Sequence, residues 1–209
     1  MYEGRWIFLA LAITGTGAYF SSLPLLGLVP VALIFFSLWF FRDPERVPPE
    51  DPTLAVSPAD GVVTGVDEVN EEQFFKCRMR RISIFLSVFD VHVNRTPIEG
   101  EVLFTEACGG IYLDARKPEA SLLNESLFWV IGSRESLDRA VGVKQITGAI
   151  ARRIVPWARL GEVLERGERF GMIRFGSRTD FYCPIDTEVL VVIGQKVKGG
   201  ETAVARMVG

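Results

Sequence analysis

Three side chains in this sequence are of the types that together make a hydroxyl nucleophilic. Ser177 follows Gly176, His92 is the one histidine of the chain, and Asp60 precedes a glycine ahead of a valine-rich run. An imidazole can take the hydroxyl proton while a carboxylate fixes its tautomer and stabilises the imidazolium. The three residue types therefore predict either a serine hydrolase or a protein that attacks its own backbone.

Each of these residues also has an ordinary structural interpretation. A lone histidine often serves packing, an aspartate before a glycine is a common turn former, and Gly132 and Ser133 form a second glycine-serine pair. His92, however, follows an apolar run and precedes a proline, a position at which a scaffold presents a side chain to a cleft. The prediction therefore depends on the combination and not on any single residue.

The neighbours of Ser177 favour the second chemistry. The hydrolase elbow G-x-S-x-G is missing, because Phe175 and Thr179 stand where its two glycines would be. A glycine directly before the serine suits attack on the preceding carbonyl, since a residue without a Cβ adopts strained dihedrals and leaves that carbonyl open. A membrane-bound serine hydrolase that uses the same three side chains stays open as an alternative.

A long uncharged stretch precedes the region that holds these residues. Residues 6–41 contain no charged side chain. As one helix the stretch would be about 54 Å long, well beyond a hydrocarbon core of about 30 Å. Serines and a proline at residues 21–24 offer turn chemistry. Residues 1–41 are therefore predicted to form a membrane-associated helical hairpin, either spanning or shallow.

Charge and cysteine content limit the kinds of partner and metal site that the sequence allows. The 23 basic and 26 acidic residues give a net charge of −3, which argues against nucleic-acid binding because such proteins cluster basic residues against phosphates. Cys77, Cys108 and Cys183 lack paired or metal-binding spacing, so we expect free thiols and no metal site. Arg5 and Arg42 flank the apolar stretch and predict a domain on the cytoplasmic face of the cell membrane.

Two regions follow the apolar stretch. Residues 42–54, rich in proline and charge, are predicted to be a linker, and residues 55–209 to be the catalytic domain. Short β-branched runs bounded by glycine or proline predict strands at 61–66, 81–88, 101–106, 127–132, 140–146 and 189–193. One short helix is predicted at 149–155, and the valine runs of 189–204 are similar to a barrel-sandwich hairpin. The fold class predicted is mainly β with a few helices (α+β), with a barrel-sandwich-like catalytic domain.

The sequence resembles the short, membrane-associated form of the phosphatidylserine decarboxylase proenzyme. Matching segments follow one another along nearly the whole chain: FFRDPER at 40–46, SPADG at 57–61, FDVHVNR at 89–95, IARRIV at 150–155 and GERFGMIRFGSR at 167–178. The last segment is long enough to be highly specific. The resemblance implies pyruvoyl-dependent decarboxylation of phosphatidylserine, or of a related serine phospholipid such as archaetidylserine, to the ethanolamine lipid.

The resemblance also implies how the chain is processed. It implies autocatalytic serinolysis between Gly176 and Ser177, which leaves a large subunit of residues 1–176 and a small subunit of residues 177–209 as a heterodimer. Ser177 then becomes the covalent pyruvoyl cofactor, whose carbonyl forms a Schiff base with the substrate amine. The implied partners are the serine phospholipid and the membrane, with no nucleic acid, and homo-oligomerisation stays open.

His92 and Arg95 are the residues expected to bind the substrate, and His92 is also the candidate acid that reprotonates the substrate Cα. Longer members of the family have two histidines spaced H-x-x-H in this segment, and the second usually belongs to the triad. Here the second position is Arg95, so either His92 performs both tasks or the short form is cleaved with different assistance. The alternative without catalysis is a membrane-tethered barrel-sandwich adaptor.

Overall fold

A computed structural model describes residues 9–14, 28–149, 153–174 and 176–207. The chain forms two compact units, Met1–Pro44 and Glu45–Gly209, and each is described by itself. In the first unit, helix α2 spans Leu28–Phe40 and residues 9–14 are also helical. Within the described ranges, no helix combines the length and the apolar character needed to cross a membrane. The predicted hairpin turn at residues 21–24 lies outside the described residues.

Helix α2 is apolar on every side. Its 13 residues contain no charge, and most of its large side chains are exposed, Phe35 at 68%. Pro30 lies in the first turn, where a missing N–H leaves no partner unsatisfied. After its C-terminal end, the guanidinium of Arg42 lies 4.1 Å from the centre of the Trp39 ring and donates to the Trp39 carbonyl. An uncharged helix that ends in an aromatic and a basic residue is typical of a membrane-associated segment.

The second unit is built from three antiparallel sheets. The largest has eight strands in the order β13-β2-β3-β11-β7-β6-β5-β9, and the smaller ones have the orders β1-β14-β12 and β4-β10-β8. The strands are β1 (Leu54–Val56), β2 (Gly61–Glu71), β3 (Cys77–Leu86), β4 (Val93–Arg95), β5 (Gly100–Cys108), β6 (Ser126–Ser133), β7 (Ser136–Ile146), β8 (Ile154–Pro156), β9 (Val163–Leu164), β10 (Arg169–Ile173), β11 (Ser177–Pro184), β12 (Glu188–Val189), β13 (Lys196–Val197) and β14 (Ala203–Arg206). The predicted fold class, mainly β with a few helices, is confirmed.

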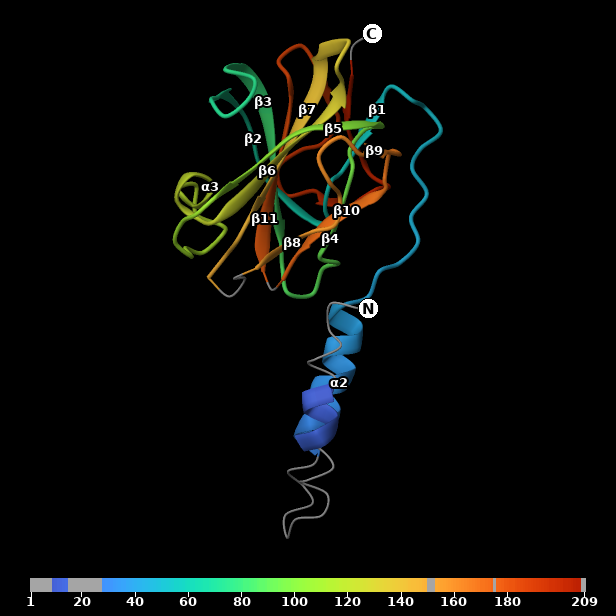
Figure 1. The fold of residues 1–209 in the computed structure, drawn as a ribbon, viewed down its shortest axis with the longest axis vertical. Coiled ribbons are helices and arrows are strands. Elements are labelled where there is room, and N and C mark those ends of the chain that lie inside the picture. Colours follow the sequence, from blue (N-terminus) through green and yellow to red (C-terminus); the bar gives the residue numbers. More distant parts are fainter. Residues whose placement is uncertain (1–8, 15–27, 150–152, 175, 208–209) are drawn as a thin grey trace. The chain divides into compact units, whose positions relative to one another are not determined.

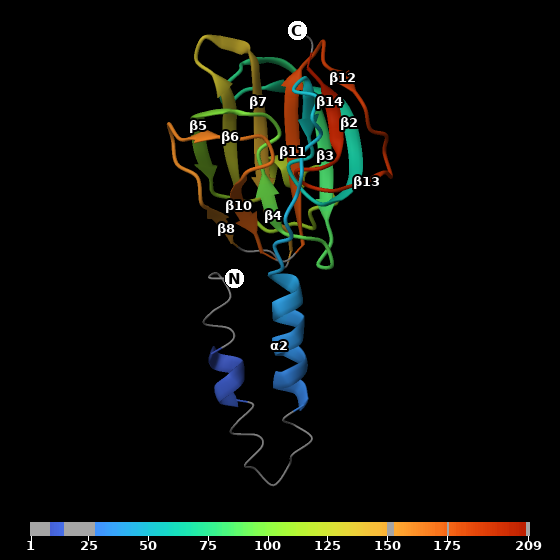
Figure 2. The same ribbon diagram turned by 90° about the vertical axis from the view of Figure 1, so that its right-hand side faces the viewer.

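The main core lies between the curled large sheet and the two small sheets. Figures 1 and 2 show the small sheets lying across one side of the large one. Alternate residues of the large sheet, among them Ile84 and Phe181, point into this core and meet Val204 of β14. Trp129 of β6 packs against Phe170 of β10 with ring centres 5.3 Å apart. This packing fixes β4 and β10, which border the site, against β11.

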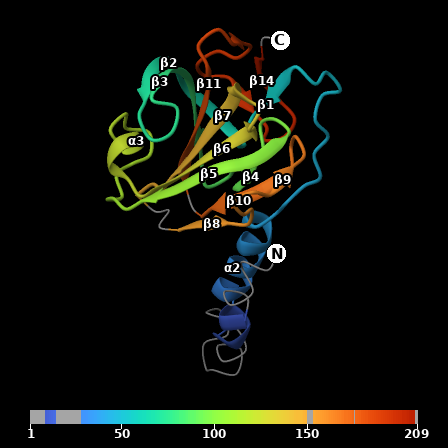
Figure 3. The same ribbon diagram turned by 45° about the horizontal axis from the view of Figure 1, so that its top comes forward.

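The opposite side of the large sheet has its own cover. A short helix, α3 (Ala120–Leu123), lies on that side, away from β10 and β1 in Figures 1 and 3. A smaller apolar cluster on the same side includes Phe128 and Tyr182, whose rings meet edge to face at 5.6 Å. Strand β11 is therefore buried on both faces.

Most predicted strands are confirmed, and two predicted elements are wrong. The runs at 61–66, 81–88, 101–106, 127–132 and 140–146 fall largely within β2, β3, β5, β6 and β7. The predicted strand 189–193 is wrong beyond Val189, because Gly194 adopts a φ of 89° and closes a turn. The predicted helix 149–155 is also wrong where it is described, because Ile154–Pro156 forms β8 and pairs with β10.

The segment predicted as a linker contains no helix or strand over residues 42–53. It does contact the domain: the guanidinium of Arg166 donates to the main-chain carbonyls of Pro49, Asp51 and Leu54. Arg46 in the same segment forms ion pairs with Asp60 and Glu201. The part from residue 45 onward is thus attached to the domain by side chains of the domain itself.

Candidate active site

The glycine and serine of the predicted cleavage site stand at the start of the central strand β11. Ser177 is the first residue of the strand, pairs with Leu86 of β3 and is fully buried. Its Oγ has no hydrogen-bond partner among the residues that the structure describes. A buried polar atom left unsatisfied costs roughly 1–3 kcal/mol, so this hydroxyl calls for a functional explanation. Gly176 has a φ of 64°, a left-handed conformation that favours glycine.

His92 lies against this glycine. Its Nε2 accepts the backbone N–H of Gly176 at 3.2 Å, and its Nδ1 lies 2.9 Å from the carbonyl oxygen of Asp90. Because a carbonyl only accepts, Nδ1 must hold the proton, and Nε2 presents its lone pair to the cleavage site. The Asp90 carboxylate in turn accepts from the backbone N–H and the hydroxyl of Ser87, which closes the turn before His92. The structure thus brings two of the predicted residues, His92 and Ser177, to one place.

A second glycine makes room for the carbonyl of the cleavage site. A Cβ on Gly148 would lie 2.4 Å from the carbonyl oxygen of Gly176 and 3.3 Å from the Cβ of Ala115. No side chain fits at the first distance, so the backbone of Gly148 closely approaches the Gly176 carbonyl. Thr147 holds this segment by donating its hydroxyl to the carbonyl of Glu125 at 2.9 Å.

Asp60 lies in the turn before β2. Its carboxylate accepts the backbone N–H of Gly199 at 2.7 Å and pairs with Arg46 at 2.9 Å. These contacts tie the turn to the connection between β13 and β14. In this structure the main-chain carbonyl of Asp90 orients the His92 ring. The proposed contact between Asp60 and His92 stays a prediction.

Arg95 ends strand β4. It is 4% exposed, and one of its terminal nitrogens donates to the carbonyl of Gly167 at 3.0 Å. Its side chain also packs closely over Gly200, where an added Cβ would lie 2.7 Å from the Arg95 Cδ. The expected contact of Arg95 with the substrate stays a prediction.

Four buried neutral side chains form a continuous chain on the face of β11 that carries Ser177. The Trp129 Nε1 donates to the Gln145 Oε1 at 2.8 Å, and the Gln145 Nε2 donates to the Asn94 Oδ1 at 2.8 Å. The Asn94 Nδ2 then donates to the hydroxyl oxygen of Thr179 at 3.1 Å. This chain connects β4, which directly follows His92, to the strand that begins with Ser177.

A pocket of about 280 Å³ opens beside the cleavage site. Its lining includes Phe85, Ser87, Val88, Ala149, Gly176 and residues 114–116. The hydrogen bonds and charge of Arg116 lower the pKa of the Asp114 carboxyl to about 2, so both groups are charged at neutral pH. The pocket therefore combines apolar walls with a charged pair, in reach of a ligand that touches Gly176.

Several of these features could not be found by the residue patterns considered above. Nothing in a sequence marks the carbonyl of Asp90, because every residue has one. Gly148 has a weak signal, a glycine two residues after a predicted strand. Asn94 and Gln145 are polar residues inside or next to apolar runs, a pattern that indicates a buried polar contact but not its partner.

The structure also bears on metal binding and cysteine chemistry. In the described part of the chain, no group of three or more His, Cys, Asp or Glu residues is arranged to hold a metal ion. Cys77, Cys108 and Cys183 are free thiols, exposed, partly buried and buried respectively. Burial raises the pKa of the Cys183 thiol to about 11, so that thiol is a weak nucleophile at neutral pH.

A histidine nitrogen that accepts the Gly176 N–H, one residue before a buried serine hydroxyl and next to a pocket, makes this region the candidate active site. The family model described as phosphatidylserine decarboxylase matches residues 33–205. A relative named phosphatidylserine decarboxylase proenzyme, from Carboxydothermus hydrogenoformans, is 46% identical over 209 residues, which cover 99% of this chain and 96% of that relative. A relative of the same name from Symbiobacterium thermophilum is 47% identical over 182 residues, 87% of this chain and 84% of that relative. The chain therefore belongs to the phosphatidylserine decarboxylase family and is an enzyme of that family.

Proposed function

We propose that the chain is made as a proenzyme, cuts itself between Gly176 and Ser177, and then decarboxylates the serine headgroup of a phospholipid to give the ethanolamine lipid. The observation that carries this proposal is the buried Ser177 hydroxyl, which has no partner among the described residues and follows a glycine held by His92. The word proenzyme in the names of the relatives supports the first step, and the word decarboxylase supports the second.

The self-cleavage uses groups of this chain alone, with water. The Ser177 Oγ attacks the carbonyl carbon of Gly176, and the Nε2 of His92 takes the hydroxyl proton. The amide becomes an ester, and the nitrogen of residue 177 becomes a free amine. Loss of the α-proton of residue 177 then breaks the ester and leaves Gly176 with a carboxylate. Water finally replaces the nitrogen of residue 177, so one water is consumed and one ammonia is released.

The backbone around the bond supports this reaction. Gly176 is held at a φ of 64°, and the missing side chain of Gly148 leaves room beside its carbonyl oxygen. A glycine at each position lets the carbonyl turn toward the hydroxyl without a Cβ in its way. Glycine adopts this left-handed conformation at no steric cost, so the bond can be held in place without a side chain beside its carbonyl.

The surroundings of residue 177 fit the pyruvoyl group that this reaction would leave there. The residue is fully buried, and the side chains that follow it on the same face, Thr179 and its partner Asn94, are neutral. The group supplies a ketone that takes the substrate amine and accepts the electron pair left when CO2 departs. The backbone of Leu86 would hold residue 177 in place, and the Nε2 of His92 would return a proton to the substrate Cα.

The pocket beside Gly176 fits a headgroup better than a whole lipid. Its volume of about 280 Å³ is at the lower limit of small-molecule pockets, roughly 300–1,000 Å³. We therefore place the serine and phosphate inside it, with Arg116 next to the phosphate, and the tails outside. His92 and Arg95 stay the proposed substrate-binding residues. Diacyl and isoprenoid ether tails are not distinguished at such a site.

The first unit would hold the enzyme at the membrane. Helix α2 exposes most of its large apolar side chains and ends beside the stacked pair of Trp39 and Arg42. Tryptophan and arginine at the end of an apolar helix suit the membrane interface on the cytoplasmic side. The placement of the catalytic domain on the cytoplasmic face of the cell membrane is part of this proposal.

Two glycine-serine pairs in one chain allow a matched test. We expect Ser177→Ala to leave a folded, uncut and inactive chain, whereas Ser133→Ala at the exposed pair should cut and decarboxylate like the natural protein. Intact mass should show the natural protein as two fragments divided before residue 177, with the smaller one lighter by one ammonia than a hydrolysed peptide. An uncut natural protein with full activity would refute the mechanism. If that uncut protein is labelled by a fluorophosphonate at Ser177, the serine hydrolase alternative is correct.

A further inference from the structure

Arg178 follows Ser177 and belongs to a buried polar cluster on the face of β11 opposite to that of Ser177. We propose that Arg178 is a positioning residue: its guanidinium, fixed by this cluster, holds residue 177 at the reaction centre before and after the cut. The inference rests on the proposed function. It concerns the face of the strand opposite to His92, so Arg178 acts through residue 177 and not by contact with the substrate.

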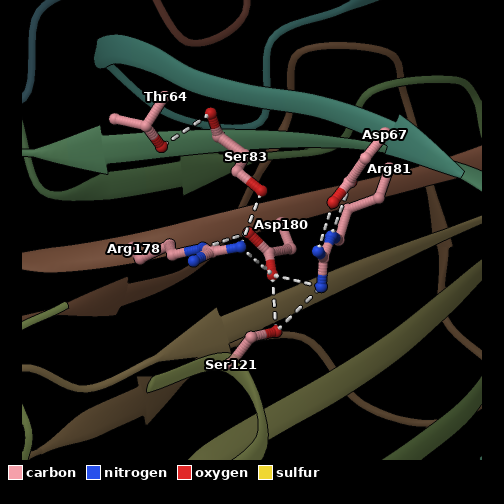
Figure 4. Close-up of polar contacts among 7 residues, drawn as sticks. All are labelled: Thr64, Asp67, Arg81, Ser83, Ser121, Arg178 and Asp180. Carbon is pink, nitrogen blue, oxygen red and sulfur yellow. Dashed lines mark hydrogen bonds and ion pairs between the residues drawn. The ribbon is translucent and has the colours of Figure 1, made fainter. Parts of the chain in front are cut away.

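The cluster fixes the guanidinium of Arg178 through two of its nitrogens. The Arg178 Nε donates to one carboxylate oxygen of Asp180 at 2.6 Å, and a terminal nitrogen donates to the other at 3.1 Å. The same nitrogen donates to the hydroxyl of Ser83 at 2.7 Å, and Ser121 donates to Asp180 at 2.7 Å. Figure 4 shows the four side chains converging between β3, β11 and α3. A planar guanidinium in such a fork has little freedom left.

A second arginine completes the charge balance of the cluster. Arg81 lies 4.0 Å from the Asp180 carboxylate and forms two short hydrogen bonds with Asp67, as Figure 4 shows. Burial opposes the charge of Arg81, but Asp67 and Asp180 outweigh burial and raise the pKa of Arg81. The cluster therefore contains two arginines and two aspartates, and none of the four charges stands alone.

The cluster joins the two fragments that the cut would create. Arg178 and Asp180 belong to residues 177–209, whereas Ser83, Arg81 and Ser121 belong to residues 1–176. Buried ion pairs contribute little net stability because burying the charges is costly. Their effect here is to specify geometry, since the bonds of Arg178 to Ser83 and of Ser121 to Asp180 fix side chains of one fragment to the other.

Residue 177 needs such support once the peptide bond is gone. In the sheet, Ser177 pairs only with Leu86 of β3, whereas Arg178 pairs with both Phe85 of β3 and Ile146 of β7. A new chain terminus that is bonded on one side tends to fray. Arg178 is thus the first residue of β11 that is held on both sides, and its side chain is the first that is anchored.

The same cluster also reaches the proposed substrate pocket. Ser121 lies in α3, which ends the loop that contains Asp114 and Arg116 of the pocket wall. Asn124, directly after α3, fixes this loop by bonding the N–H and the carbonyl of Leu113. Displacement of Asp180 would therefore loosen the pocket wall as well as residue 177, whereas loss of the Arg178 guanidinium leaves the bond between Ser121 and Asp180 in place.

The test compares the arginines that follow the two glycine-serine pairs. Arg178→Met keeps the apolar stem and removes the charge, Arg178→Lys keeps the charge and removes the fork, and Arg134→Met is the matched control at an exposed site. Three quantities are measured: the rate of self-cleavage, kcat and KM per mole of ketone-bearing small fragment, and amide hydrogen exchange at residues 178–182. Exchange is measured in the uncut Ser177→Ala chain, so that it does not depend on cleavage or activity.

We expect Arg178→Met to slow cleavage and lower kcat by roughly 100-fold, the cost of a misplacement of about 1 Å at a reacting group. KM should change little, exchange at the start of β11 should accelerate, and Arg178→Lys should fall between. Normal cleavage and kcat with only a lower melting temperature would overturn the inference and leave a purely structural role. Should Arg178→Met not fold, Arg178→Lys and Ser83→Ala decide by the same measurements. If the natural protein and Arg134→Met also stay uncut, the proposed function fails, whereas exchange still reports on Arg178.

Discussion

The tripeptide Gly-Ser-Arg occurs twice in this chain, at residues 132–134 and at residues 176–178, in opposite surroundings. Ser133 is exposed where β6 ends, and its hydroxyl accepts the backbone N–H of Glu135 at 3.2 Å. Ser177 is fully buried and has no partner for its hydroxyl among the described residues. The first hydroxyl is satisfied by its own turn, whereas the second is left available for reaction.

The arginines differ in the same way. The side chain of Arg134 is 70% exposed and pairs with Glu101 at the surface, whereas that of Arg178 is 7% exposed and pairs with a fully buried Asp180. A surface pair is screened by water and contributes little, but a buried pair is costly to break. The tripeptide alone therefore does not distinguish the proposed site from a surface turn. Burial, the contact of Gly176 with His92 and a fixed neighbouring arginine distinguish it.

The largest effect is expected from the histidine, which only the second tripeptide has beside it. His92→Ala should slow cleavage at Gly176 by about 10²–10⁴-fold, the usual contribution of a positioned base. Cleavage is followed by gel and intact mass. His92→Ala that cuts normally yet cannot decarboxylate would restrict His92 to the second reaction, and the two tripeptides would then differ mainly in burial.

The next largest effect concerns the acidic partners of the two arginines, Asp180 for Arg178 and Glu101 for Arg134. Asp180→Ala leaves Arg178 buried without its carboxylate, and breaking a buried pair costs about 3–5 kcal/mol. Glu101→Ala, at the exposed tripeptide, should leave the free energy of unfolding unchanged. Chemical denaturation of both variants in the uncut Ser177→Ala background measures the difference. Equal losses for the two variants would contradict the contrast between a buried and a surface pair.

A smaller effect is expected from the hydrogen-bonded series of neutral side chains, from Trp129 to Thr179, that lies beside Ser177. Gln145→Leu removes the acceptor of the Trp129 N–H and the donor to Asn94. Each buried group left unpaired costs about 1–3 kcal/mol. Denaturation should show this loss, and cleavage should slow because β4, next to His92, is less well fixed. An unchanged cleavage rate despite the lost stability would assign the chain to folding alone.

The sequence alone was sufficient for the fold class, because strands have local signals: β-branched runs predicted β2, β3, β5, β6 and β7. It also named Ser177 and His92 as candidates, and the structure places His92 against Gly176, the neighbour of Ser177, while their roles stay predictions. The central strand β11 was not predicted. Its residues alternate between Thr179 or Phe181 on one face and Arg178 or Asp180 on the other, and buried charges look like exposed ones in a sequence.

The partners of the site residues could not be predicted, because they depend on long-range contacts. Asp90 orients His92 through a main-chain carbonyl, a group that every residue has, and Gly148 approaches the Gly176 carbonyl from the end of another strand. Of the two wrong elements, 149–155 has the same long-range cause, whereas 189–193 is ended by a local turn. Ile154–Pro156 becomes a strand through pairing with β10, and a glycine turn ends the other run.

The smallest effect concerns Cys183, at the far end of the β11 face that begins with Ser177. Cys183 ends this face, and burial raises its pKa from 9.0 to about 11. The folded state therefore favours the protonated thiol, and this contribution to stability is constant below pH 9 and declines as the pH rises from about 9 to about 11. The unfolding free energy of the natural protein should thus fall more steeply over this range than that of Cys183→Ala, with no difference in slope below it. Parallel profiles would show that Cys183 ionises freely in the folded protein.

Alkylation with iodoacetamide at pH 8 tests the same property chemically. The exposed Cys77 should react, whereas the small fragment, which contains only Cys183, should stay unmodified. The reason is that the thiolate population of Cys183 is about 100-fold lower than that of a thiol with the ordinary pKa.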